Sequence, residues 1–262
     1  MTSTQQRNEL TIDGRRISYL DFGPATGRPL LALHGHISEG AAFAGLAAQL
    51  GDEWRVIAPD QRGHGDSDRA ADYSRQGYID DLVALLAHLG LDSTVALGHS
   101  LGGINAYQLA AQHPRLVSAI INIEGPAALP EGPSGLSFVA GFPYTAPTRE
   151  ELIAATGPVG PMIATSLRPT PDGGWRLPFH PQDTIDSETL VHGDHWADWT
   201  GSTCPALFIH GTKSQVITTE LAQQMTERRP HTTTVQLDGD HFAHAQDPEG
   251  FAAAVTAFLA AL

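Results

Sequence analysis

The chain has 262 residues, of which 41% are hydrophobic and 17% charged, a composition typical of a globular protein with one sizeable core. Its 29 Asp and Glu residues against 15 Lys and Arg residues give a formal net charge of −14. This negative field repels phosphate backbones and anionic membrane surfaces. We therefore expect neither nucleic acid nor a membrane as a partner, and no strongly anionic substrate.

The N-terminal sequence and the cysteine content indicate the cellular compartment of the protein. MTSTQQRNEL lacks an apolar signal core, and no apolar run approaches the ~18 residues that span a bilayer. The single cysteine, Cys204, precedes a proline at the mouth of an apolar run and cannot form an internal disulfide. We expect a cytoplasmic protein in which Cys204 is structural.

Strand and helix patterns alternate along most of the chain. LTI (10–12) and RISYLDF (16–22), joined by Asp13-Gly14, predict a hairpin. Short runs that are apolar throughout predict strands buried on both faces, and they lie at 30–35, 54–60, 93–100, 117–125, 205–211 and 233–239. Helix patterns separate them at 41–50, 78–90, 101–112, 218–229 and 248–261. This order predicts an α/β fold with a mostly parallel sheet covered on both faces, whose chemistry gathers at the carboxyl ends of the strands.

Residues 126–203 interrupt this alternation. They hold 11 of the 18 prolines and three of the four tryptophans. A connection of this length between two buried strands is too long for an ordinary loop, and GGWRLPF and HWADW carry too much apolar surface for a disordered segment. We expect a lid or cap that folds over one edge of the sheet.

The most specific motif is VALGHSLGG (95–103), in which an apolar strand leads through Gly98-His99-Ser100-Leu101-Gly102 into a helix. G-x-S-x-G in this setting is typical of a nucleophile elbow, where glycines remove the Cβ atoms that would clash as strand and helix close on each other. The pattern predicts Ser100 as a nucleophile at a helix N-terminus. The alternative is a glycine-rich turn whose serine only caps the helix.

A serine nucleophile needs a base and an oxyanion site. His241, in QLDGDHFAHAQDP, follows the last predicted strand and is favoured as the base over His244. The backbone N–H groups of Leu101 and His36 are the expected oxyanion donors. Two groups of residues could instead be read as metal ligands: His34, His36 and Glu39, and His192 and His195. Neither group shows a complete ligand set at recognisable spacing, so we expect no metal.

Together these residues resemble the α/β-hydrolase fold superfamily over essentially the whole chain. The matching motifs, in the family's order, are LALHG (31–35), APDQRGHGDSD (58–68), GHSLGG (98–103), CPALFIHG (204–211) and GDHFAHAQDPEGF (239–251). The resemblance implies an eight-stranded core domain formed by residues 1–125 and 204–262, with residues 126–203 as a cap between strands six and seven. It also implies no cofactor, and hydrolysis through an acyl-enzyme.

The acid of the expected triad is not where many members of this superfamily carry it. The family's usual position after strand seven falls on Ser214, which cannot supply a negative charge. Glu124 ends the predicted strand six, where some branches of the superfamily carry the acid, and we predict Glu124 as the triad carboxylate. A strand-end carboxylate that caps a lid helix or pairs with an arginine is the alternative, while Asp60, Asp238 and Asp240 are disfavoured as the acid.

The expected activity is hydrolysis of a carboxylic ester or lactone of a neutral, fairly apolar small molecule, of the serine esterase or lactonase kind. A C–C bond hydrolase, thioesterase or perhydrolase with the same triad is an alternative, and a non-catalytic protein that binds a small ligand is another. Aromatic residues of the cap are candidates for the substrate pocket, although each could equally form the cap's own small core; they are Phe138, Phe142, Tyr144, Trp175 and Phe179.

Overall fold

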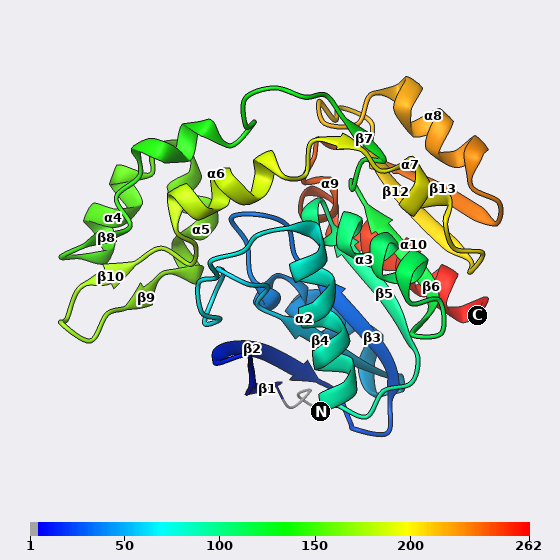
Figure 1. Ribbon diagram of the computed structural model, residues 1–262, viewed down its shortest axis with the longest axis horizontal. Helices are drawn as coiled ribbons and strands as arrows, with labels where there is room; N and C mark the ends of the chain where they lie inside the picture. Colours follow the sequence, from blue (N-terminus) through cyan, green and yellow to red (C-terminus); the bar gives the residue numbers. More distant parts are fainter. Residues whose placement is uncertain (1–4) are drawn as a thin grey trace.

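The computed structural model describes residues 5–262 and is built around an eight-stranded sheet (Figure 1). The strands lie in the order β1-β2-β4-β3-β5-β6-β12-β13. Their bounds are β1 (Gln5–Ile12), β2 (Arg15–Phe22), β3 (Arg28–Leu33), β4 (Trp54–Pro59), β5 (Thr94–His99), β6 (Val117–Ile123), β12 (Ala206–Gly211) and β13 (Thr232–Leu237). β2 is antiparallel to both of its neighbours and all other neighbouring strands are parallel, which confirms the predicted fold class.

Helices cover both faces of the sheet because the strands are apolar on both faces. One face packs against α2 (Arg75–His88), α3 (Leu101–Gln112) and α8 (Thr219–Arg228). The other packs against α1 (Ala44–Leu50) and α10 (Pro248–Ala260), and the short α9 (Ala243–Gln246) precedes α10. Two 3₁₀ turns, η1 (Gly40–Phe43) and η2 (Gly51–Glu53), flank α1.

α2 begins three residues before the predicted start, because Ser74 caps it. The Ser74 side chain accepts a hydrogen bond from the Gly77 N–H, which satisfies one free donor of the first turn.

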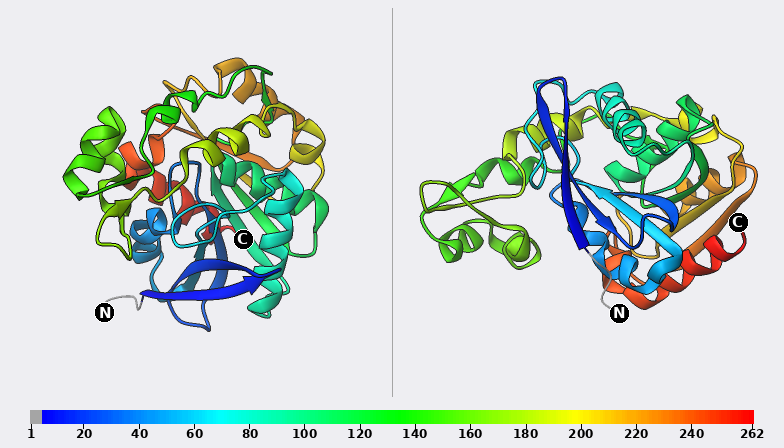
Figure 2. Two further views of the ribbon diagram at one scale, coloured as in Figure 1. Left: turned by 60° about the vertical axis from the view of Figure 1, so that its left-hand side comes forward. Right: turned by 90° about the horizontal axis from the view of Figure 1, so that it is seen from below.

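Residues 126–203, here called the insertion, lie between β6 and β12 and are folded. Most of their elements are short: β7 (Ala128–Leu129), η3 (Ser137–Gly141), β8 (Thr145–Ala146), α4 (Arg149–Ala155), η4 (Gly157–Val159), α5 (Gly160–Ile163), η5 (Ala164–Ser166), β9 (Arg168–Pro169), β10 (Trp175–Arg176), α6 (Pro181–Thr189), β11 (Gly193–Asp194) and α7 (Trp196–Thr200). The lobe that carries α4 and α5 projects from the side of the molecule (Figures 1 and 2).

The insertion has two packing environments. The projecting lobe has a small core of its own, which includes Val139, Leu152 and Leu177. The last helix of the insertion, α7, instead packs in the main core. There the Trp199 ring lies 5.6 Å from the Tyr107 ring, and the indole N–H of Trp199 donates to a backbone oxygen in α8. The end of the insertion is therefore packed as part of the core.

No helix within residues 5–262 is long and apolar enough to cross a lipid bilayer.

Candidate active site

Ser100 lies at the sharp turn between β5 and α3. Its backbone has φ 53° and ψ −118°, a left-handed conformation that is strained for a residue with a side chain. A Cβ atom at Gly98 would collide with the backbone of Gly102, so strand and helix can approach this closely only with glycine there. The Ser100 N–H donates to the Ile123 carbonyl at 2.8 Å, which ties the turn to the end of β6. This is the geometry predicted for the elbow.

Glu124 directly follows β6 and is fully buried. One carboxylate oxygen accepts from the Gly211 N–H at 2.7 Å and lies 3.0 Å from His210 Nδ1. The other accepts from the Ser214 hydroxyl at 2.6 Å and lies 3.2 Å from His241 Nδ1. Burial alone would raise the pKa of Glu124, but these four hydrogen-bonding groups outweigh it and lower the pKa to about 2. The group is therefore a buried carboxylate anion that faces His241.

Ser214 occupies the position at which the sequence lacked an acid. Its hydroxyl donates to Glu124 and accepts from the N–H groups of Val216 and Ile217 at 3.2 and 3.1 Å. The serine thus holds the carboxylate that comes from the neighbouring strand. This contact could not be predicted, because residues 212–216 are an irregular loop whose path a strand pattern does not reveal.

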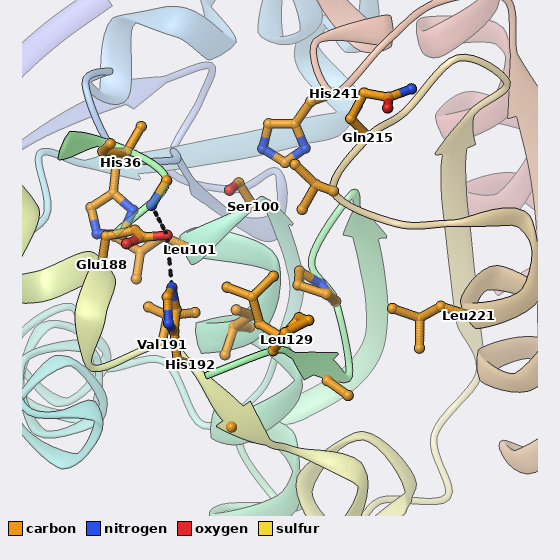
Figure 3. Close-up of a pocket in the computed structure, with 18 of the residues that line it drawn as sticks. His36, Ser100, Leu101, Leu129, Glu188, Val191, His192, Gln215, Leu221 and His241 are labelled. Carbon is orange, nitrogen blue, oxygen red and sulfur yellow. Dashed lines mark hydrogen bonds and ion pairs between the residues drawn. The ribbon is translucent and has the colours of Figure 1, made fainter. Parts of the chain in front are cut away.

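His241 lies in the loop between β13 and α9, and its side chain is 18% exposed. Because the carboxylate can only accept, Nδ1 carries a proton and Nε2 is left as the basic nitrogen. Ser100 and His241 line the same cavity (Figure 3), although Ser100 Oγ has no hydrogen-bond partner among residues 5–262.

His244 is less suited to the role of base. Burial, together with the nearby His241, lowers the pKa of His244 to about 4. Its ring packs against His99, with centroids 4.2 Å apart, and its Nδ1 has no partner in the described part of the chain. The structure brings His241, and not His244, to the carboxylate.

The β3 loop (residues 34–37) passes close to the elbow. A Cβ atom at Gly35 would lie 3.2 Å from Ser100 Cβ, so this loop and the elbow are in contact. His34 fixes the loop from the core side, because its Nε2 accepts from the Gln61 N–H at 2.9 Å and its Nδ1 lies 2.7 Å from the Gly35 carbonyl. Leu101 is the first residue of α3, where backbone N–H groups have no partner within the helix. The loop and the helix start are thus adjacent, as the prediction for the two oxyanion donors requires.

The histidines considered as metal ligands have other partners. His36 Nε2 lies 3.0 Å from Ser187 Oγ, and Glu39 forms an ion pair with Arg168. His192 Nε2 lies 3.2 Å from Glu188, and His195 Nε2 lies 2.6 Å from a backbone carbonyl. Within residues 5–262, no group of three or more His, Cys, Asp or Glu side chains is placed to hold a metal ion.

Asp60 is buried and structural. It forms an ion pair with Arg7 at 2.5 Å and accepts from the backbone N–H groups of Gly40 and Asp66 at 2.8 and 3.0 Å.

A cavity of about 830 Å³ opens above Ser100, a volume typical of small-molecule sites (Figure 3). Its walls are mainly apolar. The insertion, the loop after β12 and α8 supply residues that the sequence did not assign to a pocket: Leu129, Glu188, Val191, His192, Gln215 and Leu221. β7 and β11 pair with each other at this wall, but two-residue strands leave no detectable pattern in a sequence.

The five aromatic residues predicted for the pocket do not line this cavity, so that prediction is corrected. Phe179 is buried in the small core of the projecting lobe, and Phe142, Tyr144 and Trp175 pack against it. Phe138 is 52% exposed. The alternative considered from the sequence, that these residues form the cap's own core, describes four of the five.

A model of the α/β-hydrolase fold family matches residues 28–248, which is most of the chain. The chain belongs to the α/β-hydrolase fold family. This match confirms the resemblance inferred from the five motifs.

Similarity to individual hydrolases extends over nearly the whole chain. 2-(Acetamidomethylene)succinate hydrolase of Mesorhizobium japonicum is 29% identical over 95% of this chain and 94% of its own length. 3-Hydroxybutyrate-oligomer hydrolase of Cupriavidus necator is 27% identical over 94% of each chain. The crystal structure of E-2-(acetamidomethylene)succinate hydrolase has a TM-score of 0.83 and 25% identity, covering 98% of this chain and 99% of that one. These relatives support a hydrolase, and their names differ in the compound that is hydrolysed.

Proposed function

We propose that this protein is a serine hydrolase that cleaves a carboxylic ester or lactone of a neutral, fairly apolar small molecule through an acyl-enzyme. The observation that carries the proposal is the contact of Glu124 with His241 beside the strained Ser100 elbow. A buried anion that orients a histidine, next to a presented serine, is the arrangement that activates a hydroxyl nucleophile.

In the proposed reaction, Ser100 Oγ attacks the carbonyl carbon and its proton passes to His241 Nε2. Glu124 stabilises the resulting imidazolium, while the N–H groups of His36 and Leu101 donate to the oxyanion. Collapse of the intermediate breaks the C–O bond, and the imidazolium protonates the leaving alcohol. Water then attacks the acyl-enzyme by the same steps and releases the acid.

The polarity of the cavity supports a neutral substrate. Within the described residues, no Lys or Arg side chain lines it, whereas the carboxylates of Glu188 and Asp194 do. An anionic acyl group would therefore find no Lys or Arg partner among these residues and would face like charges. The succinate in the name of the first relative carries two carboxylates, so we propose that this chain acts on a different substrate. The expected cytoplasmic location stays a prediction.

Labelling and turnover test the proposal together. We expect the wild type to hydrolyse p-nitrophenyl acetate and butyrate and to react with a fluorophosphonate probe, with both activities lost in Ser100→Ala because the nucleophile is gone. An ester and lactone panel of varied ring size would then rank the substrates.

The outcomes of this test separate the alternatives. Hydrolysis that persists in Ser100→Ala would contradict the assigned nucleophile. A wild type that neither turns over an ester nor is labelled would favour the non-catalytic binding protein.

A further inference from the structure

The β3 loop has a second anchor on the side of the insertion. His36 Nε2 lies 3.0 Å from Ser187 Oγ in α6, and the same Ser187 Oγ lies 2.8 Å from Tyr78 Oη in α2. All three side chains are buried, with exposures of 9% for His36, 0% for Ser187 and 2% for Tyr78. A continuous chain of hydrogen bonds thus runs from the core helix α2 through the insertion to the loop beside Ser100.

The His36 ring is neutral and is held in place by the Ser187 hydroxyl. Burial, with smaller contributions from His64, Arg75 and other nearby histidines, holds the pKa of His36 well below its usual value, so the ring is neutral. A neutral imidazole has one donor and one acceptor nitrogen, and a hydroxyl group can pair with either. The contact with Ser187 therefore fixes the orientation of the ring, whichever way the two hydroxyl groups donate.

The same segment of the insertion faces the substrate cavity. Glu188, the residue after Ser187, lines the cavity, and so does His36 itself (Figure 3). Ile37 has φ 56°, a strained conformation for a β-branched residue, and its side chain packs into the small core of the projecting lobe. Such a backbone persists only when its surroundings hold it. The conformation of the β3 loop therefore depends on how the insertion is docked.

We propose that Ser187 and Tyr78 are positioning residues, which hold His36 and its backbone N–H in the geometry that stabilises the oxyanion when α6 is docked on the core. The inference rests on the proposed function, because it uses the His36 N–H as an oxyanion donor. A donor of this kind acts mainly in the transition state, so its displacement lowers kcat more than it raises KM. Loss of one such donor lowers kcat by a factor of about 10²–10³, and displacement of the donor lowers kcat by a smaller factor.

Tyr73 offers a matched control. It is also a buried core tyrosine whose hydroxyl reaches α6, where it donates to Asp183 Oδ2 at 2.7 Å. The two tyrosine rings lie 6.5 Å apart. Tyr73→Phe removes a contact that docks the same helix but has no connection to His36. If Tyr78 only helped to dock α6, Tyr78→Phe and Tyr73→Phe should therefore have the same effect on kcat.

The kinetic test compares kcat and KM for p-nitrophenyl butyrate in the wild type, Tyr78→Phe, Ser187→Ala and Tyr73→Phe. We expect kcat to fall about ten- to a hundredfold in Tyr78→Phe and Ser187→Ala, with KM changed by less than about threefold, and to stay within about threefold in Tyr73→Phe. Equal effects of the two tyrosine variants, or a rise in KM at unchanged kcat, would overturn the inference.

A spectroscopic test does not depend on turnover. The ring ¹⁵N resonances of His36, assigned by their absence in His36→Gln, should move in Ser187→Ala, because Nε2 loses its hydrogen-bond partner, and should stay in place in Tyr73→Phe. Unchanged shifts in both Ser187→Ala and Tyr78→Phe would overturn the positioning role. If the wild type hydrolyses no ester while the shifts change as expected, the proposed function fails and the structural link between the insertion and the loop remains.

Discussion

Glu124 and Ser214 meet at one carboxylate oxygen, from the ends of two neighbouring strands. The sequence allowed Glu124 to be predicted as the acid, because it ends an apolar run beside the elbow strand and matches a position that some branches of the family use. It could not reveal that Ser214 donates to Glu124, since a side-chain contact across 90 residues of sequence leaves no local pattern. Ser214, which stands where many family members carry an acid, instead donates to the carboxylate of Glu124.

The low pKa of Glu124 predicts how stability changes with pH. The folded-state pKa of about 2 lies below the value of about 4.3 for an unfolded chain. The carboxylate therefore stabilises the fold at pH values above the unfolded-state pKa. This contribution is lost as the pH falls towards the folded-state pKa. Two pKa units correspond to a contribution on the order of 3 kcal/mol. Urea unfolding should show wild type losing its stability advantage over Glu124→Gln between about pH 5 and pH 2.

An exposed carboxylate provides the control for this measurement. Glu227→Gln removes a charge on the surface of α8, and its stability should follow that of the wild type across the same pH range. A constant difference between wild type and Glu124→Gln over the whole range would contradict the assigned pKa.

At the level of helices and strands, the core was predictable and most of the insertion was not. Long apolar runs identified the strands of the sheet, and α3 has the predicted bounds. The insertion is built from two-residue strands and short helices, too short for a periodic pattern, so its aromatic residues were assigned to the pocket by composition alone. They form the core of the projecting lobe because that lobe has little else to bury.

Helix α7 yields a stability prediction. Trp199 is fully buried in the main core between Tyr107 and Phe208, whereas Trp196 on the same helix is partly exposed. Trp199→Ala should lower the free energy of unfolding by about 3–5 kcal/mol, and Trp196→Ala by clearly less. Urea unfolding measures both. Equal effects of the two variants would contradict the packing of the insertion's last helix in the main core.

For the molecule as a whole, the net charge and the charged residues that line the cavity are both negative. The chain carries a formal charge of −14, and within residues 5–262 the cavity beside Ser100 is lined by carboxylates without a Lys or Arg. The sequence predicted the repulsion of anionic partners from composition, but it could not locate the cavity, because the cavity forms where the insertion, the elbow and the loop after β12 meet. The fold, and the proximity of Ser100, His241 and Glu124, could therefore be predicted from motifs, whereas the residues that line the cavity could be found only from the three-dimensional arrangement.

The central claim is that Glu124 is the acid of a Ser100–His241–Glu124 triad. The most direct test is kcat for p-nitrophenyl butyrate in Glu124→Gln, which keeps the shape of the side chain and removes its charge. We expect kcat to fall by roughly 10⁴, because an amide neither holds the required His241 tautomer nor stabilises the imidazolium. A Glu124→Gln enzyme whose kcat stays within about tenfold of the wild type would contradict the account.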